Sequence, residues 1–133
     1  MRHSIAPRVY ADLVGKPYAD GGRGPHAYDC VGLALELQRR LGRKLPPYLS
    51  DEDSLHTAVA EGGELHESQR IDAPEAGCLV LMREGLGCHI GCMIDDAWML
   101  HTYRKIGSAV RQPLQRSLFR SRVMGFYRTE TSA

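Results

Sequence analysis

The sequence lacks any long apolar run. It has no stretch of about 18 consecutive apolar residues, the shortest that crosses a bilayer as a helix, so no membrane span is expected. The N-terminal residues MRHSIAPR also lack the apolar centre of a signal peptide. We therefore expect the protein to be cytoplasmic as it is synthesised.

The chain also has little net charge. It contains 17 basic and 16 acidic residues, and a formal net charge of +1 is too small to indicate nucleic acid as a partner. The charges are uneven, because residues 104–128 contain seven Arg or Lys and no acid. We interpret this segment as a solvated basic surface. The alternative is affinity for an anionic polymer, including a cell-wall polymer.

No internal repeat, low-complexity segment or linker divides the chain. Its 133 residues are the usual size of one compact domain, and 43% hydrophobic with 25% charged residues is typical of an ordered globular protein. We therefore expect one domain over residues 1–133. The chain has four cysteines, Cys30, Cys78, Cys88 and Cys92. In a cytoplasmic chain we expect free, catalytic or metal-bound cysteines rather than disulfides.

The N-terminal half has the apolar spacing of helices. A short helix is predicted over residues 7–14, where a glycine follows as a stop. Asp29 is a suitable N-cap for a second helix over residues 29–41, in which leucine recurs every four residues. A third helix is predicted over residues 51–60, after a double proline.

The C-terminal half has the spacing of short strands. Apolar and alternating runs bounded by turn residues predict strands over residues 78–82, 88–94, 98–103, 109–111 and 122–128. Leu118 and Phe119 are expected on a short helical turn between the last two strands. Helices followed by strands joined by tight turns indicate an α+β fold, with N-terminal helices packed on an antiparallel sheet of about five strands.

Cys30 stands at the predicted start of the helix over residues 29–41, behind a glycine-rich loop over residues 21–25. A helix N-terminus has unpaired N–H groups and a partial positive charge. This position favours the thiolate, which is the nucleophilic form of cysteine. The N–H of Cys30 is also suited to stabilise an oxyanion.

A cysteine nucleophile needs a general base and a third group that orients the base, and histidine suits the base. Of six histidines, His89 and His101 lie on adjacent predicted strands separated by one turn. Strand alternation puts Gly91 on the face of His89, which leaves room for an approaching group. Each histidine alone is typical of a polar residue on a half-buried sheet. Together with Cys30 they predict a Cys–His site.

Cys88 and Cys92 have the spacing of zinc ligands, with His89 between them. Residues four apart on an extended strand are, however, ~13 Å apart, too far for one ion or a disulfide. We therefore predict no metal site, and interpret the three later cysteines as small buried hydrophobes. His26 is interpreted as an exposed loop residue, and a substitute base is the alternative.

Several segments resemble those of a known family. LVGKPY at 13–18, GGRGP at 21–25 and YDCVGL at 28–33 resemble the signature of the NlpC-type cell-wall cysteine peptidases, a papain-like family of bacteria and phage tails. Later segments resemble the family's strands in order: PEAGCLVL at 74–81, CHIGCMI at 88–94, MLH at 99–101 and VMGFYR at 123–128. The resemblance covers nearly the whole chain.

The resemblance implies a role for each candidate residue. Cys30 would be the nucleophile, His89 the general base and His101 the group that orients it, with Tyr18 beside the nucleophile. The implied activity is hydrolysis of a peptide bond between D-glutamate and a diamino acid in the stem peptides of peptidoglycan. No cofactor is implied.

Two positions depart from the family pattern. Ala19 stands where the family often has Trp, and Val31 where it often has Ser, and both are expected to change the lining of the substrate pocket. Asp29, the expected helix cap, is also predicted as an auxiliary residue of the pocket. Phage members vary here, which suggests a phage or prophage protein with phage tail proteins as partners and the virion as a location. The alternatives are a catalytically silent binding module of a phage tail and a cysteine- and histidine-dependent amidase. The Tyr18 motif and the strand order favour the endopeptidase.

Overall fold

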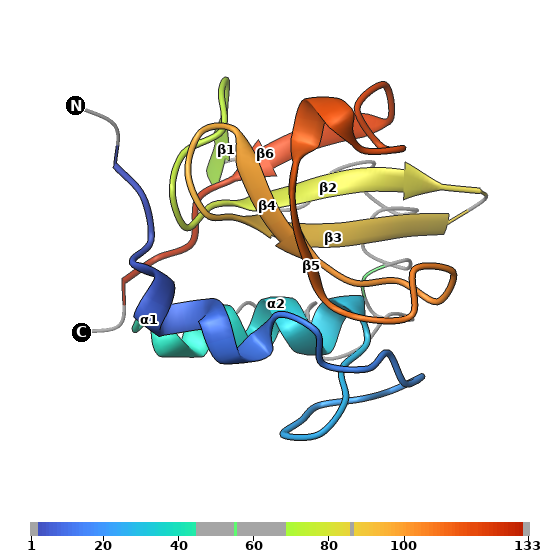
Figure 1. Ribbon diagram of the computed structural model, residues 1–133. Helices are drawn as coiled ribbons and strands as arrows, with labels where there is room; N and C mark the ends of the chain where they lie inside the picture. Colours follow the sequence, from blue (N-terminus) through green and yellow to red (C-terminus); the bar gives the residue numbers. More distant parts are fainter. Residues whose placement is uncertain (1–2, 45–54, 56–68, 86, 132–133) are drawn as a thin grey trace.

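The structure, a computed structural model, describes residues 3–44, 55, 69–85 and 87–131. One long helix packs against one face of a twisted antiparallel sheet (Figure 1). The helix predicted over residues 51–60 lies outside the described residues, apart from residue 55. Among the described helices, none combines the length and the apolar character that a bilayer span requires.

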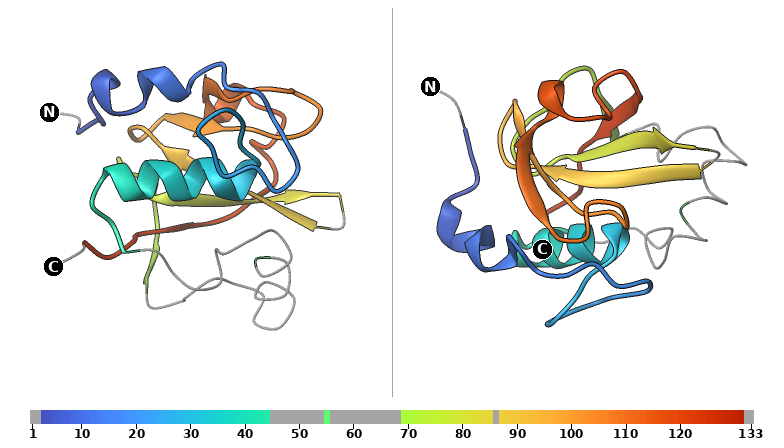
Figure 2. Two further views of the ribbon diagram at one scale, coloured as in Figure 1. Left: turned by 90° about the horizontal axis from the view of Figure 1, so that it is seen from below. Right: turned by 45° about the vertical axis from the view of Figure 1, so that its right-hand side comes forward.

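The first two helices begin where the sequence predicts them. Helix α1 (Pro7–Tyr10) continues into a 3₁₀ turn, η1 (Ala11–Leu13), so the predicted helix over residues 7–14 ends one residue early. Helix α2 (Cys30–Arg40) has Asp29 as its N-cap, and the Asp29 carboxylate accepts a 2.6 Å hydrogen bond from the Gly32 N–H. Seen from below, α1 lies alongside α2 (Figure 2).

The sheet has six strands among the described residues, in the order β1-β6-β2-β3-β4-β5, and every neighbouring pair is antiparallel. Its strands are β1 (Arg70–Ile71), β2 (Leu79–Glu84), β3 (Gly87–Met93), β4 (Trp98–His101), β5 (Val110–Pro113) and β6 (Val123–Tyr127). The α+β prediction is confirmed. The sixth strand is β1, which is two residues long and too short to show a periodic pattern.

The helical turn between the last strands differs from its prediction. It is a 3₁₀ turn, η4 (Leu114–Arg116), and it precedes Leu118 and Phe119, which lie in the turn that follows. Phe119 is 2% exposed and Leu118 is 69% exposed. Phe119 packs over the sheet and Leu118 points to solvent. The two apolar residues are adjacent in the sequence, but they do not form the apolar face of a helical turn.

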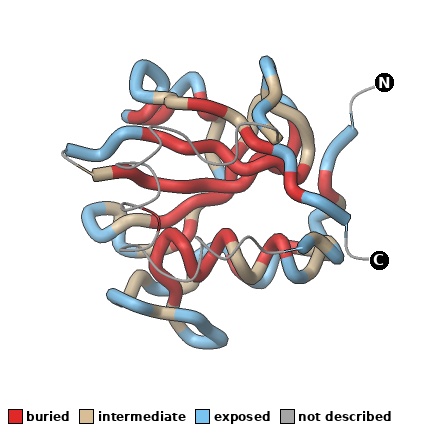
Figure 3. Tube along the Cα trace, turned by 180° about the vertical axis from the view of Figure 1, so that it is seen from behind, coloured by how far each residue is buried: buried red, intermediate tan, exposed pale blue. Residues whose placement is uncertain are grey.

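The core forms two layers because the side chains of β3 alternate. Cys88, Ile90 and Cys92 belong to the apolar cluster that includes α2, whereas Met93 belongs to a second cluster on the opposite face with Phe119. Figure 3 shows the central strands β3 and β4 and the first part of β2 buried, and the loops at the strand ends exposed. This alternation decides which face of the sheet each site residue occupies.

Candidate active site

The glycine-rich loop packs closely on the start of α2. The Asp29 N–H donates to the Gly22 carbonyl at 3.2 Å, and Arg23 Nη1 donates to Asp29 Oδ1 at 2.7 Å. A Cβ atom on Gly32 would lie 2.0 Å from the Gly22 carbonyl oxygen, so only glycine allows this approach. The loop therefore holds the first turn of α2, and Cys30 with it, in one position.

The two candidate histidines are brought together by the β3–β4 pairing. His89 Nε2 and His101 Nδ1 are 2.9 Å apart, and the two residues are 0% and 1% exposed. A Cβ atom on Gly91 would lie 3.2 Å from His101 Cβ and 3.4 Å from the Leu100 carbonyl oxygen. Gly91 therefore makes room for β4 itself, and this close approach places His101 against His89.

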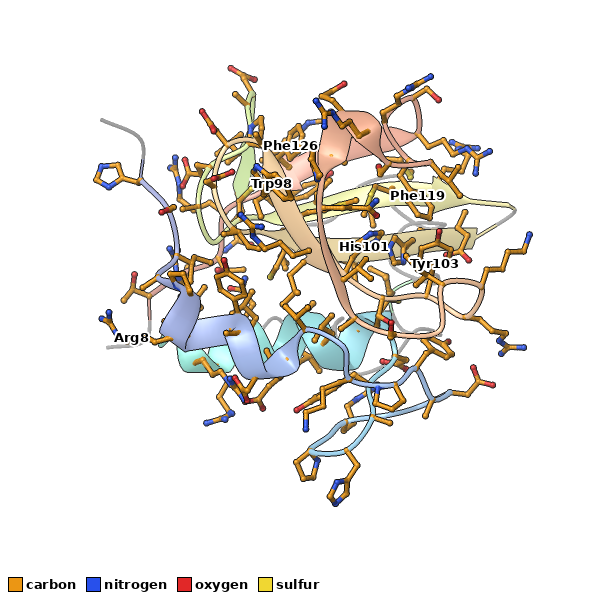
Figure 4. All side chains as sticks on the ribbon, in the orientation of Figure 1. Arg8, Trp98, His101, Tyr103, Phe119 and Phe126 are labelled. Carbon is orange, nitrogen blue, oxygen red and sulfur yellow. The ribbon has the colours of Figure 1, made fainter. Side chains whose placement is uncertain are left out.

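Aromatic side chains enclose the histidine pair. Phe119 stacks on His89 with ring centroids 4.7 Å apart, and Tyr103 meets His89 edge-on at 5.6 Å. In Figure 4, the side chains of His101, Tyr103 and Phe119 lie close to one another beside β3. Because this enclosure excludes water, no solvent stabilises a positive charge on either ring.

Burial keeps both imidazoles neutral at neutral pH. It lowers the pKa of His89 well below its usual value, and the neighbouring His101 lowers that pKa further. Burial also lowers the pKa of His101 to about 4, although the hydrogen bond with Gln112 acts in the opposite direction. A neutral imidazole has one N–H and one lone pair, so each ring has one donor nitrogen and one acceptor nitrogen.

Cys30 and His89 both line a cavity of about 330 Å³. Its lining residues are Tyr18, Cys30, Glu84, Gly87, Cys88, His89, Tyr103, Arg104 and Lys105. Among the described residues, the Nδ1 atom of His89 has no hydrogen-bond partner, and it lies 3.7 Å from a carboxylate oxygen of Glu84. Cys30 and His89 thus share one cavity, and His101 contacts His89 from behind.

Tyr18 lies at the rim of this cavity. Its hydroxyl donates to Asp20 Oδ1 at 3.0 Å, and Arg104 Nη2 donates to the same oxygen at 2.6 Å. The Tyr18 backbone N–H donates to the Gly107 carbonyl at 2.9 Å, which ties the N-terminal segment to the loop between β4 and β5. Tyr18 therefore bounds the same cavity that Cys30 lines.

Three residues expected at the pocket do not line the cavity: Ala19, Val31 and Asp29. Val31 is fully buried in the apolar cluster beneath the sheet, so the expectation that it changes the pocket wall is wrong. Its side chain packs on the core in the same apolar cluster as Ala34, which lies three residues further along α2 and therefore on the same side of the helix. Asp29 is likewise buried, and it serves as the helix cap rather than as a pocket wall.

The structure adds site residues that the sequence did not single out. Glu84, Arg104 and Lys105 line the cavity, Gln112 contacts His101, and Phe119 covers His89. Tyr103 shares the face of His101 by strand alternation, which was visible in the sequence. The charged residues lie at strand ends and in a loop, where no periodic pattern exists to single them out.

The remaining cysteines contrast with Cys30. Burial raises the pKa of Cys78 to about 11 and that of Cys92 to about 12, so both stay neutral thiols at neutral pH. In the described part of the chain, no group of three or more His, Cys, Asp or Glu is arranged to hold a metal ion. Cys88 is buried among apolar residues and also borders the cavity.

Solved structures with the same fold come from several organisms. NlpC1 from Trichomonas vaginalis has 20% sequence identity and a TM-score of 0.68, over 91% of this chain and 41% of that one. An NlpC/P60 family protein from Bacillus cereus ATCC 10987 has 18% identity and a TM-score of 0.68, over 95% and 41%. The peptidoglycan hydrolase RipB from Mycobacterium tuberculosis has 19% identity and a TM-score of 0.56, over 91% and 61%.

This chain therefore spans less than half the length of the first two structures. A comparison with curated protein sequences finds no match. The family model described as the NlpC/P60 family matches residues 15–128, which is most of the chain and includes every lining residue of the cavity. The chain thus belongs to the NlpC/P60 family, whose members are cysteine peptidases.

Proposed function

We propose that this protein hydrolyses a peptide bond in the stem peptides of bacterial peptidoglycan, with Cys30 as nucleophile, His89 as general base and His101 as the group that orients His89. The observation that carries the proposal is the shared cavity, which is lined by Cys30 and His89. Behind the cavity, His89 is hydrogen-bonded to His101. The naming of RipB as a peptidoglycan hydrolase supports the substrate class.

The reaction follows from the arrangement of these groups. Cys30 Sγ attacks the carbonyl carbon of the scissile bond while its thiol proton passes to His89 Nδ1, the nitrogen that has no other partner among the described residues. The oxyanion of the tetrahedral intermediate faces the N–H of Cys30 at the start of α2. The C–N bond then breaks, and His89 Nδ1–H protonates the leaving amine.

Water completes the cycle. It attacks the carbonyl carbon of the Cys30 thioester and gives a proton to His89 Nδ1, and the C–S bond breaks to release the carboxylic acid. His89 then returns its proton to the thiolate. His101 holds the His89 ring through the 2.9 Å bond in both half-reactions, so the same nitrogen faces the substrate throughout.

The charges of the cavity suit a stem peptide that carries both signs. Glu84 can receive an ammonium group, and Arg104 and Lys105 can receive a carboxylate. A D-glutamyl residue followed by a diamino acid offers both groups next to the scissile bond. This charge pattern supports the bond that the family resemblance implies, while association with a phage tail or a virion stays a prediction from Ala19 and Val31.

The test is digestion of purified wall peptides by three proteins: the wild type, Cys30→Ala and Cys78→Ala. We expect the wild type and Cys78→Ala to cut between D-glutamate and the diamino acid, and Cys30→Ala to be inactive, with products identified by mass. The control removes the same sulfur from a cysteine that is buried outside the cavity. Cleavage that persists in Cys30→Ala would overturn the mechanism.

Digestion of intact peptidoglycan by the same three proteins separates the alternative functions. Release of intact stem peptides from the glycan identifies an amidase, because that product requires cleavage of the sugar-to-peptide link. Binding of wall material without cleavage by any of the three proteins identifies a silent binding module.

A further inference from the structure

A third side chain, the half-buried Gln112, extends the histidine pair. His101 Nε2 is hydrogen-bonded to Gln112 Oε1 on β5, while His101 Nδ1 lies 2.9 Å from His89 Nε2. Strands β4 and β5 pair with Met99 opposite Gln112 and His101 opposite Val110, so the pairing holds the amide beside the imidazole. The result is a chain of groups that runs from β5 through His101 to His89, which lines the cavity.

A histidine in the orienting role has an ambiguity that a carboxylate lacks. A neutral imidazole exists in two tautomers, and either of its nitrogens can be the donor. If His101 carried its proton on Nδ1, it would donate to His89 Nε2, and the His89 proton would then sit on Nδ1. His89 would have no lone pair toward the cavity, and it could not accept the thiol proton of Cys30.

The amide oxygen of Gln112 removes this ambiguity, because a carbonyl oxygen only accepts hydrogen bonds. His101 Nε2 must therefore be the donor, and its Nδ1 must be the acceptor. His89 Nε2 then donates to His101 Nδ1, which leaves the lone pair of His89 on Nδ1. That is the buried nitrogen for which the described residues provide no hydrogen-bond partner.

We propose that Gln112 is a positioning residue that selects the tautomer of His101, and through it the tautomer of His89, so that His89 Nδ1 presents a lone pair to Cys30. The inference rests on the proposed function, because it concerns the base of the same reaction. Other described groups around His101 do not replace the amide: Phe119 and Tyr103 present ring carbons to it, with centroids 5.8 and 5.6 Å from that of His101.

Histidine ring nitrogens in the folded protein report the tautomer directly. In ¹⁵N NMR spectra at neutral pH, we expect His101 and His89 each to show a protonated Nε2 and an unprotonated Nδ1. This measurement needs no substrate, so it stands even if the wild type cleaves no wall peptide. A wild-type spectrum with His89 protonated on Nδ1 overturns the inference, whatever the activity of the enzyme.

Two variants at position 112 then test cause and effect. Gln112→Met keeps the size of the side chain and removes the acceptor, so the buried His101 Nε2–H loses its partner and the reverse tautomer becomes favoured. We expect His89 Nδ1 to become protonated and kcat to fall ~10-fold, with KM unchanged because Gln112 does not line the cavity. Gln112→Glu restores an acceptor, so we expect the wild-type tautomers and kcat.

A matched control is Gln115→Met, which makes the same exchange at an exposed glutamine three residues away. We expect it to leave both the spectrum and kcat unchanged. An active wild type together with a Gln112→Met protein that keeps the wild-type tautomers and kcat would overturn the inference and leave the proposed function intact. If Gln112→Met does not fold, the wild-type spectrum and the Gln112→Glu variant still decide the question.

Discussion

The two faces of the sheet are built from the same strands but differ in chemistry. The face toward α2 is mainly apolar, and Ile90 and Leu37 are fully buried in it. Its polar exception is the buried Gln38 on α2, whose amide is hydrogen-bonded to Gly77, Cys92 and Thr129. The opposite face is also covered by apolar side chains, but it contains a row of hydrogen-bonded polar side chains that runs from Gln112 through His101 to His89. Cys30 belongs to the first face and His89 to the second, and the cavity is where they meet.

The comparison shows how the fold can bury His89, the proposed general base, and still give its ring nitrogens defined surroundings. Buried apolar side chains need only complementary shapes, whereas the nitrogens of a buried imidazole also need hydrogen-bond partners. On the second face these partners form one continuous chain, and Phe119 closes it from above. Of the four ring nitrogens of His89 and His101, only His89 Nδ1 has no hydrogen-bond partner among the described residues. It is the nitrogen proposed to take the proton of Cys30.

The largest effect should come from the base itself. His89→Gln keeps a polar side chain of similar size but cannot take a proton, so we expect kcat to fall on the order of 10⁴-fold. The matched control is His26→Gln, at an exposed loop histidine before Cys30. A strong loss in His26→Gln would make His26 the base and break the contrast between the two faces.

Truncation of one large side chain on each face should separate stability from activity. Phe119→Ala should lower the free energy of unfolding by about 4 kcal/mol, and Leu37→Ala by about 3 kcal/mol, because each leaves a cavity in a packed layer. Only Phe119→Ala should also lower kcat in the folded protein, because water then reaches His89. Urea unfolding and kcat measured on the same samples give both effects. Equal losses of kcat in Phe119→Ala and Leu37→Ala would contradict the difference between the two faces.

Acid should destabilise the second face selectively. The pKa of His101 is about 4 in the folded protein and about 6.5 in the unfolded chain, so the unfolded chain binds more protons between these values. Stability is therefore complete above pH ~6.5, and about 3 kcal/mol is lost as the pH falls to ~4. Urea unfolding across this range should show a smaller loss in His101→Asn, which has no titrating ring. An identical pH dependence in both proteins would show that His101 is not the source.

The smallest effect concerns the cap of the first face. Asp29→Ala removes the acceptor of the Gly32 N–H and the partner of Arg23, so we expect a loss of about 1 kcal/mol in the free energy of unfolding. Asp72→Ala, at an exposed aspartate outside the helices, is the matched control. If kcat falls in Asp29→Ala although the protein remains folded, the cap also positions Cys30 for attack.

Some of this organisation was predictable, and the reasons are local. Asp29 as cap, the start of α2 and the two faces of β3 depend on residues within about one helical turn or on strict alternation. Strand β1 was missed because two residues show no period. Val31 was misplaced because a resemblance in sequence gives a neighbour along the chain, not the side of the helix that it occupies.

By itself, the sequence determined the local elements and the candidates: a cysteine at the start of a helix, two histidines on adjacent strands, and the glycines that allow close approach. Only the tertiary structure decided which side chains meet those candidates. Gln112 on β5 contacts His101 on the neighbouring strand β4. Phe119, in the turn after η4, stacks on His89, and Glu84, at the end of β2, lies near the same ring. Such contacts depend on strand register and on the path of loops, and both are set by packing of the whole domain.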